Sequence, residues 1–116
     1  METLDPAALE NLREMVSGDT EFITELVYVF LDEAPKLLSD MRQALESDDA
    51  ALLYRAAHNL KSNSAGFGAI ALSGLCRELE SMGRNGAFPG VDELLGRAKA
   101  EYAQVKVALE TVCQDL

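Results

Sequence analysis

Apolar residues recur at helical spacing through four long stretches of the chain, and short polar or glycine-containing breaks separate these stretches. The long stretches cover residues 20–47, 49–67, 69 or 70 to 83, and 91–113, and a shorter one covers residues 5–16. We find no convincing strand pattern. Because most of the helices are long and their connections are short, we predict an all-α fold. The expected architecture is an up-and-down antiparallel four-helix bundle with a short extra N-terminal helix packed across it.

Residues that favour helix ends stand at the predicted boundaries. Asp5 is a candidate N-cap for the short first helix, and Asp19 or Thr20 can cap the first long one. Pro35 lies inside this long helix, where it removes a backbone hydrogen bond, so we expect a bend there. The predicted core face of the same helix carries Phe22, Leu26, Phe30, Leu37, Met41 and Leu45.

The totals are those of a single globular domain that spans residues 1–116. With 48% hydrophobic residues, a chain of this length can bury a core without disulfides or a structural metal. The longest purely apolar run, residues 26–31, is too short to cross a bilayer, and the N-terminal residues lack the basic and apolar regions of a secretory signal. We therefore expect a cytoplasmic location and no membrane association.

Charge and cysteine usage narrow the classes of partner. A net charge of -10 argues against nucleic acid, because phosphates require a basic surface. Cys76 and Cys113 form no CxxC or zinc-binding spacing, so we expect both to be reduced and buried, with no metal and no cofactor. A monomer that binds other proteins is the expectation that remains.

The only histidine of the chain, His58, falls on the polar side of the predicted helix over residues 49–67. A helix turns about 100° per residue, which places His58 roughly 140° from the core residue Leu53 and therefore toward solvent. No Asp or Glu occurs from residue 50 to residue 77, although the chain has 20 acidic residues. We expect no carboxylate to lie close to the ring.

The residues expected on the same face as His58 are mostly small or basic. They are Ala51, Tyr54, Arg55, Lys61, Ser62 and Ala65. The small side chains leave the imidazole open to an approaching protein, and the two cations suit an anion that arrives at the ring. A surface histidine without any role is the ordinary alternative.

A neutral imidazole beside an ammonium group can take up a phosphoryl group. Its ring nitrogen is a nucleophile near neutral pH, and Lys61, one helical turn from His58, can hold the phosphoryl oxygens. Other chemistries lack parts, since the sequence offers no partner acid for a triad, too few ligands for zinc and no glycine-rich nucleotide loop. The chain can therefore carry a phosphoryl group but not take one from a nucleotide.

The segment HNLKSNSAGFGAIALSGLCRELE resembles the signature of histidine-containing phosphotransfer (Hpt) domains, H-x-L-K-G-S-S/A-x-x-x-G-A-x-x-L followed by a helix that ends in a Leu-Glu pair. The matching positions are His58, Leu60, Lys61, Ser64, Gly68, Ala69, Leu72, Leu75, Leu79 and Glu80. The resemblance implies a four-helix bundle whose histidine relays phosphoryl groups between aspartates of response-regulator receiver domains, with hybrid histidine kinases as further partners. It implies that His58 is phosphorylated, that Lys61 stabilises the phosphoryl group, and that Arg84 stands where the family often has a basic residue.

The chain departs from this pattern at Ser62, because the family usually has glycine four residues after the histidine. The serine hydroxyl could hydrogen-bond the imidazole or a phosphoryl oxygen. Asn59 also differs from the acid that follows the histidine in dimerising kinase helices. We expect the partner-binding surface to include Ala51, Tyr54, Arg55, Ser62, Ala65 and Arg84.

Three functions stay open on the sequence. The first is a phosphocarrier in a phosphorelay, which is not an enzyme and has no nucleotide-binding or hydrolytic site. The second is a non-catalytic helical interaction module that binds receiver domains. The third is the phosphoacceptor domain of a larger histidine kinase. The presence of both His58 and Lys61 favours the first over the second.

Overall fold

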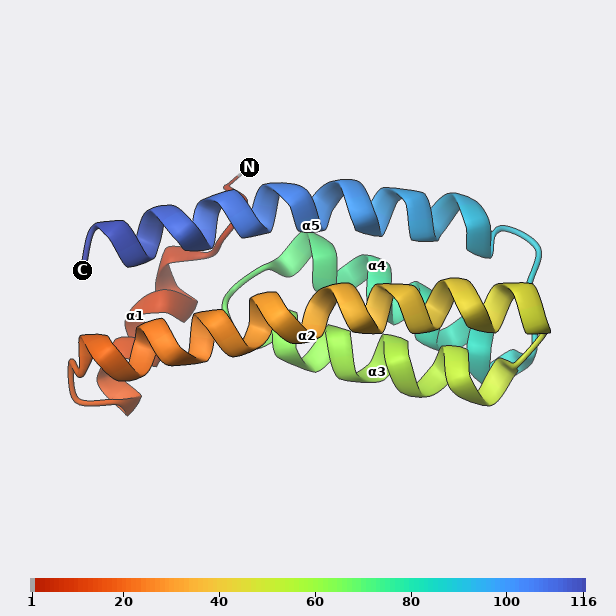
Figure 1. The fold of residues 1–116 in the computed structure, drawn as a ribbon, viewed down its shortest axis with the longest axis horizontal. Coiled ribbons are helices and arrows are strands. Elements are labelled where there is room, and N and C mark those ends of the chain that lie inside the picture. Colours follow the sequence, from red (N-terminus) through yellow and green to blue (C-terminus); the bar gives the residue numbers. More distant parts are fainter. Residues whose placement is uncertain (1) are drawn as a thin grey trace.

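The computed structural model describes residues 2–116, which form five helices and no strand (Figure 1). The helices are α1 (Pro6–Met15), α2 (Thr20–Ser47), α3 (Ala50–Gly66), α4 (Ile70–Asn85) and α5 (Val91–Gln114). Each of the four long helices packs against the next in the order α2, α3, α4 and α5, and α5 returns to pack against α2. The predicted four-helix bundle with a short N-terminal helix is therefore confirmed.

Three aspartates cap the first three helices. The carboxylates of Asp5, Asp19 and Asp49 each accept a hydrogen bond from a backbone N–H two or three residues further along, at 3.0 to 3.1 Å. The caps expected at Asp5 and at residue 19 or 20 are present. Among the described residues, no side chain caps α4 or α5.

The core face of α2 differs from the prediction at its first turn. Phe22 is 45% exposed, and its neighbour Ile23 is buried instead. Because adjacent helical residues point about 100° apart, a face that contains Ile23, Val27 and Phe30 cannot also contain Phe22. The expected stripe began one residue too early. The residues of α2 that are buried are Ile23, Val27, Phe30, Ala34, Leu37, Leu38, Met41 and Ala44.

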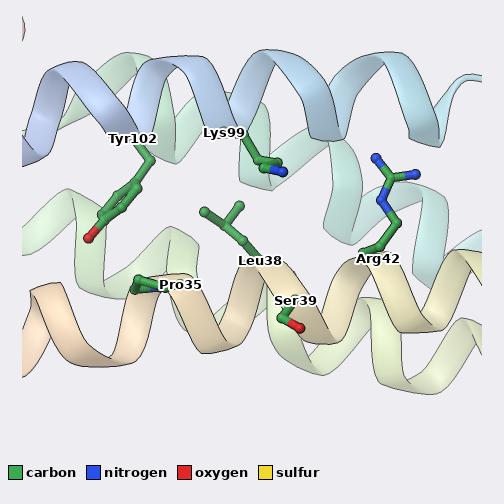
Figure 2. Close-up of a pocket in the computed structure, with 6 residues that line it drawn as sticks. All are labelled: Pro35, Leu38, Ser39, Arg42, Lys99 and Tyr102. Atoms are coloured by element: carbon green, nitrogen blue, oxygen red, sulfur yellow. The ribbon is translucent and has the colours of Figure 1, made fainter.

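Pro35 lies inside α2, which continues through it without a break. Proline has no N–H, so it leaves the carbonyl four residues earlier, that of Leu31, without its usual helical partner. The hydroxyl of Tyr102 on α5 donates a hydrogen bond to this carbonyl at 3.3 Å. Figure 2 shows Tyr102 reaching across from α5 toward the turn of α2 that holds Pro35. The bend expected at Pro35 stays a prediction.

The loop between α3 and α4 is joined to the start of α1. The backbone N–H of Asp5 donates to the Gly68 carbonyl at 2.8 Å. Gly68 has a φ of +75°, and a Cβ atom there would lie 2.9 Å from both Ala8 Cβ and Asp5 N. Glycine is therefore required at this position both by its backbone angle and by the close approach of α1.

None of the helices within residues 2–116 combines the length and the apolar character needed to cross a membrane.

Candidate functional site

His58 lies on α3 with its side chain 49% exposed, as the helical pattern predicts. Its Nδ1 atom is 3.0 Å from Oε2 of Glu80 on α4. Since a carboxylate can only accept, Nδ1 must carry the proton of this hydrogen bond, and the lone pair of the neutral ring then belongs to Nε2. Within residues 2–116, Nε2 has no hydrogen-bond partner. The site therefore presents a half-exposed imidazole with an available nucleophilic nitrogen.

The expectation that no carboxylate lies near His58 is wrong. Glu80 stands three residues beyond the acid-free window of residues 50–77, and the antiparallel packing of α3 against α4 brings it back to the imidazole. Distance along the chain was therefore a poor guide to distance in space. The sequence signal for this contact was the Leu-Glu pair of the signature. The signature fixes how far Glu80 follows His58 along the chain, but it does not show that their side chains meet.

Glu80 is the centre of a cluster of charges. Its side chain is only 7% exposed, and Lys61 Nζ lies 2.8 Å from Oε2 while Arg84 Nη2 lies 3.3 Å from Oε1. The hydrogen bond from Lys61 is the main cause that holds the pKa of Glu80 below its ordinary value, and the bond from His58 adds to it. Burial acts in the opposite direction but is outweighed. The carboxylate is therefore ionised at neutral pH.

Lys61 is directed toward Glu80 and is 23% exposed. An ammonium group has three donors, so the bond to Glu80 leaves others for a second anion. The backbone of Lys61 is also fixed, because its carbonyl accepts a hydrogen bond from Ser73 Oγ of α4 at 3.1 Å. The side chain of Lys61 is thus bonded to Glu80, and its backbone carbonyl to Ser73, both on α4.

Aromatic contacts complete the surroundings of the ring. Tyr54, one turn before His58 on α3, stacks on the imidazole with centroids 6.0 Å apart and planes 14° apart. The Arg84 guanidinium lies over the Tyr54 ring, 5.4 Å from its centroid. Sequence reasoning placed Tyr54 and Arg84 on the partner-binding surface and missed these contacts.

α3 and α4 approach closely where Tyr54 faces Gly83. A Cβ atom on Gly83 would lie 2.6 Å from the backbone nitrogen of Tyr54 and 2.9 Å from its Cα. These are backbone atoms, which cannot move aside alone, so the spacing of the two helices depends on glycine here. A shallow groove at this point is lined by Ala51, Tyr54, Arg55, Gly83 and Arg84.

The other residues expected on the partner-binding surface are accessible. Ala51, Arg55, Ser62 and Ala65 of α3 are exposed, and so is Arg84 of α4. The described residues provide no hydrogen bond between Ser62 and the imidazole. The structure thus brings Tyr54, Lys61 and Arg84 into contact with the His58 and Glu80 pair, while the four exposed residues of α3 lie outside these contacts.

Ser64, which matches the signature, is fully buried, and its hydroxyl has no hydrogen-bond partner within residues 2–116. A serine on the core side of a helix commonly packs as a small residue and bonds back to its own helix. The packing is present and the bond is not.

Residues 2–116 contain no cluster of three or more His, Cys, Asp or Glu side chains that could hold a metal ion. Both cysteines are free; Cys76 is buried and Cys113 is half-buried. Burial raises the pKa of the Cys76 thiol to about 12, so it stays protonated.

A separate groove between α2 and α5 is lined by residues of those two helices alone (Figure 2).

Comparisons with known proteins point to one family. The model of the Hpt domain matches residues 25–114 of the chain. "Histidine-containing phosphotransfer protein 2" of Arabidopsis thaliana is 26% identical over 110 residues, which are 92% of this chain and 70% of that protein. "Phosphorelay protein LuxU" of Vibrio vulnificus is 31% identical over 86 residues, or 74% of this chain and 73% of that protein. The crystal structure of histidine-containing phosphotransfer protein B (HptB) from Pseudomonas aeruginosa PAO1 superimposes with a TM-score of 0.89 at 29% identity, covering 98% of this chain and 96% of that one.

Proposed function

The chain belongs to the Hpt domain family and has a phosphotransfer role in a phosphorelay, and we propose that it relays a phosphoryl group between aspartates of receiver domains through phosphohistidine at His58. The observation that carries this proposal is the pairing of His58 Nδ1 with the buried Glu80 carboxylate, which leaves Nε2 as the nucleophile on a half-exposed ring. We propose response-regulator receiver domains and hybrid histidine kinases as the partners.

The transfer step follows from this geometry. Nε2 attacks the phosphorus of an aspartyl phosphate on the donor receiver, a P–N bond forms, and the P–O bond to the aspartate breaks. The aspartate leaves as a carboxylate with the electron pair of the broken bond. The Nδ1 proton stays in place on the hydrogen bond to Glu80, so the positive charge that develops on the ring faces a carboxylate. The same steps in reverse order deliver the group to the acceptor aspartate.

Lys61 would provide the positive charge for the phosphoryl oxygens. Phosphoryl transfer depends mainly on positioning and on charge stabilisation, and Lys61 lies next to Glu80 on the same side of α3 as His58. Arg84 and Arg55 add further positive charge on this surface of a chain whose net charge is -10. This local reversal of charge favours an acidic phosphorylated partner.

The two other candidate functions have less support. A non-catalytic interaction module has no need for a nucleophilic ring paired with a buried carboxylate and a lysine. The phosphoacceptor domain of a larger kinase would need a separate catalytic domain, and this chain would then be labelled by ATP only when that domain is added. The cytoplasmic location, the monomeric state and the absence of nucleic-acid or membrane partners stay predictions.

The test is transfer from a receiver whose aspartate carries a radioactive phosphoryl group. The label should move to this protein and should be acid-labile, as a phosphoramidate is. The variant His58→Gln should take up no label while its helical circular dichroism is unchanged. Label retained in His58→Gln would refute the assignment of His58, and an unlabelled wild-type protein with normal receiver binding would favour the interaction module.

A further inference from the structure

Four side chains, one of them the His58 imidazole, contact one another in a closed ring. His58 Nδ1 bonds Glu80 Oε2 at 3.0 Å, and Glu80 Oε1 bonds Arg84 Nη2 at 3.3 Å. The Arg84 guanidinium lies 5.4 Å from the centroid of Tyr54, whose ring stacks on His58 with centroids 6.0 Å apart. Both separations are within the range in which aromatic and cation–π contacts are attractive. Each of the four residues therefore has two neighbours in the ring.

A single hydrogen bond does not fix the orientation of an exposed imidazole. The bond from Nδ1 to Glu80 holds one edge of the imidazole, but rotation about the Cα–Cβ and Cβ–Cγ bonds of His58 can still carry Nδ1 away from the carboxylate. The Tyr54 ring lies nearly parallel to the imidazole, at 14°, and so restricts that rotation. The His58 side chain is 49% exposed, so the stack on Tyr54 is the contact that can hold its imidazole in one plane.

The position of Tyr54 is itself fixed by the backbone. Its nitrogen and Cα lie against Gly83 of α4, where a Cβ atom would come within 2.9 Å of both. Arg84, the next residue on α4, covers the ring from the adjacent helix. Helix packing therefore holds the backbone of Tyr54, and the Arg84 cation contacts its ring.

We propose that Tyr54 is a positioning residue for phosphoryl transfer: its ring holds the plane of the His58 imidazole so that Nδ1 stays bonded to Glu80 and Nε2 stays available to the phosphorus. The proposal rests on the proposed function of His58. It differs from the role that the sequence indicated for Tyr54, which was direct contact with a receiver domain. Orientation of the nucleophile affects the rate of the bound complex, whereas a receiver contact affects how tightly the complex forms.

The test compares Tyr54→Leu, which removes the flat ring, with Tyr54→Phe, which keeps it. Tyr28→Leu is the matched control, because Tyr28 is an exposed tyrosine on another helix, α2. Single-turnover transfer from a phosphorylated receiver is measured over a range of receiver concentrations. We expect Tyr54→Leu to lower the saturating rate about three- to tenfold with little change in the half-saturating concentration. Tyr54→Phe and Tyr28→Leu should behave as the wild type.

A second measurement does not depend on transfer. His58 is the only histidine, so every imidazole nitrogen signal in an NMR spectrum of the chain belongs to it. We expect the wild type and Tyr54→Phe to show the neutral ring with its proton on Nδ1, and Tyr54→Leu to show a mixture of the two tautomers. Helical circular dichroism of Tyr54→Leu should be unchanged.

The outcomes separate the possibilities. An unchanged saturating rate with a raised half-saturating concentration would make Tyr54 a receiver contact and overturn the proposal. An unchanged tautomer in Tyr54→Leu would also overturn it. A wild-type protein that accepts no phosphoryl group would refute the proposed function instead, and the nitrogen signals would still show whether Tyr54 fixes the imidazole.

Discussion

Oε2 of Glu80 lies 3.0 Å from Nδ1 of His58, although 22 residues separate the two along the chain. The same oxygen accepts a bond from Lys61 at 2.8 Å. One buried carboxylate therefore orients the candidate nucleophile and also holds the cation that the transferred group would meet. Changes at Glu80 should alter both stability and transfer.

Replacing Glu80 by Gln keeps the shape of the side chain and an acceptor for Nδ1 but removes the charge. We expect the free energy of unfolding at neutral pH to fall by about 1–2 kcal/mol, because Lys61 and Arg84 lose their ionic partner in a partly buried place. Folding lowers the pKa of Glu80, so its contribution is fully present above the ordinary carboxyl pKa of 4.5 and is lost as pH falls through the lower folded value. Urea denaturation of both proteins should therefore show a full difference at neutral pH that shrinks in acid. Glu78→Gln, at an exposed position of the same helix, should show no difference at either pH.

Replacing Lys61 by Ala removes the ammonium group expected at the phosphoryl oxygens. Transfer should slow by about tenfold or more, and the phosphohistidine should hydrolyse faster, because a charge that stabilises the transferring group is lost. Single-turnover labelling and the decay of the label measure the two effects. Lys36→Ala is the control, since Lys36 is an exposed lysine on α2 that pairs with Asp32. Loss of helicity in Lys61→Ala would show that the lysine acts in folding instead.

Replacing Gly83 by Ala places a Cβ atom against the backbone of Tyr54. The two helices must move apart, and we expect the free energy of unfolding to fall by about 1–3 kcal/mol. Gly74→Ala is a matched control on α4, because a Cβ atom there meets nothing within 4 Å. Since alanine favours helix over glycine, Gly74→Ala should raise the free energy of unfolding by about 0.5–1 kcal/mol. Equal effects of the two substitutions would contradict the close contact at Gly83.

Replacing Tyr102 by Phe removes the hydroxyl that donates to the Leu31 carbonyl. The carbonyl loses this donor, and the free energy of unfolding should fall by about 0.5–1.5 kcal/mol. In a Pro35→Ala background the residue-35 N–H can serve this carbonyl, so the same substitution should cost less. A double-mutant cycle measured by urea denaturation gives the coupling. Additive effects would show that Tyr102 does not compensate for Pro35, and the rate of phosphoryl transfer should not change in either variant.

Local rules account for most of the fold. The aspartate caps and the helical spacing predicted the five helices, because capping and periodicity depend on residues within a few positions of one another. The error at Phe22 has the same origin: two adjacent apolar residues, Phe22 and Ile23, leave the local pattern ambiguous. Which of the two is buried depends on the neighbouring helices.

The site was predicted only in part. Its exposed histidine and the nearby lysine follow from one helix, since residues three positions apart share a face. The contacts of Glu80, and those of Tyr54 with Arg84, depend on the register between α3 and α4. At one point of that register, Gly83 allows the two backbones to approach closely. A glycine within a helical pattern does not reveal which residue of another helix it faces.

The bond between Lys61 and Glu80 also bears on how strongly the site would hold a phosphoryl group on His58. Because the Lys61 ammonium group is already paired with the Glu80 carboxylate, it attracts an incoming phosphoryl dianion less strongly than an unpaired ammonium group would. If His58 carries a phosphoryl group, as proposed, this weaker attraction favours release of the group as well as its uptake. Glu80 would thereby lower the affinity of Lys61 for the bound phosphoryl group.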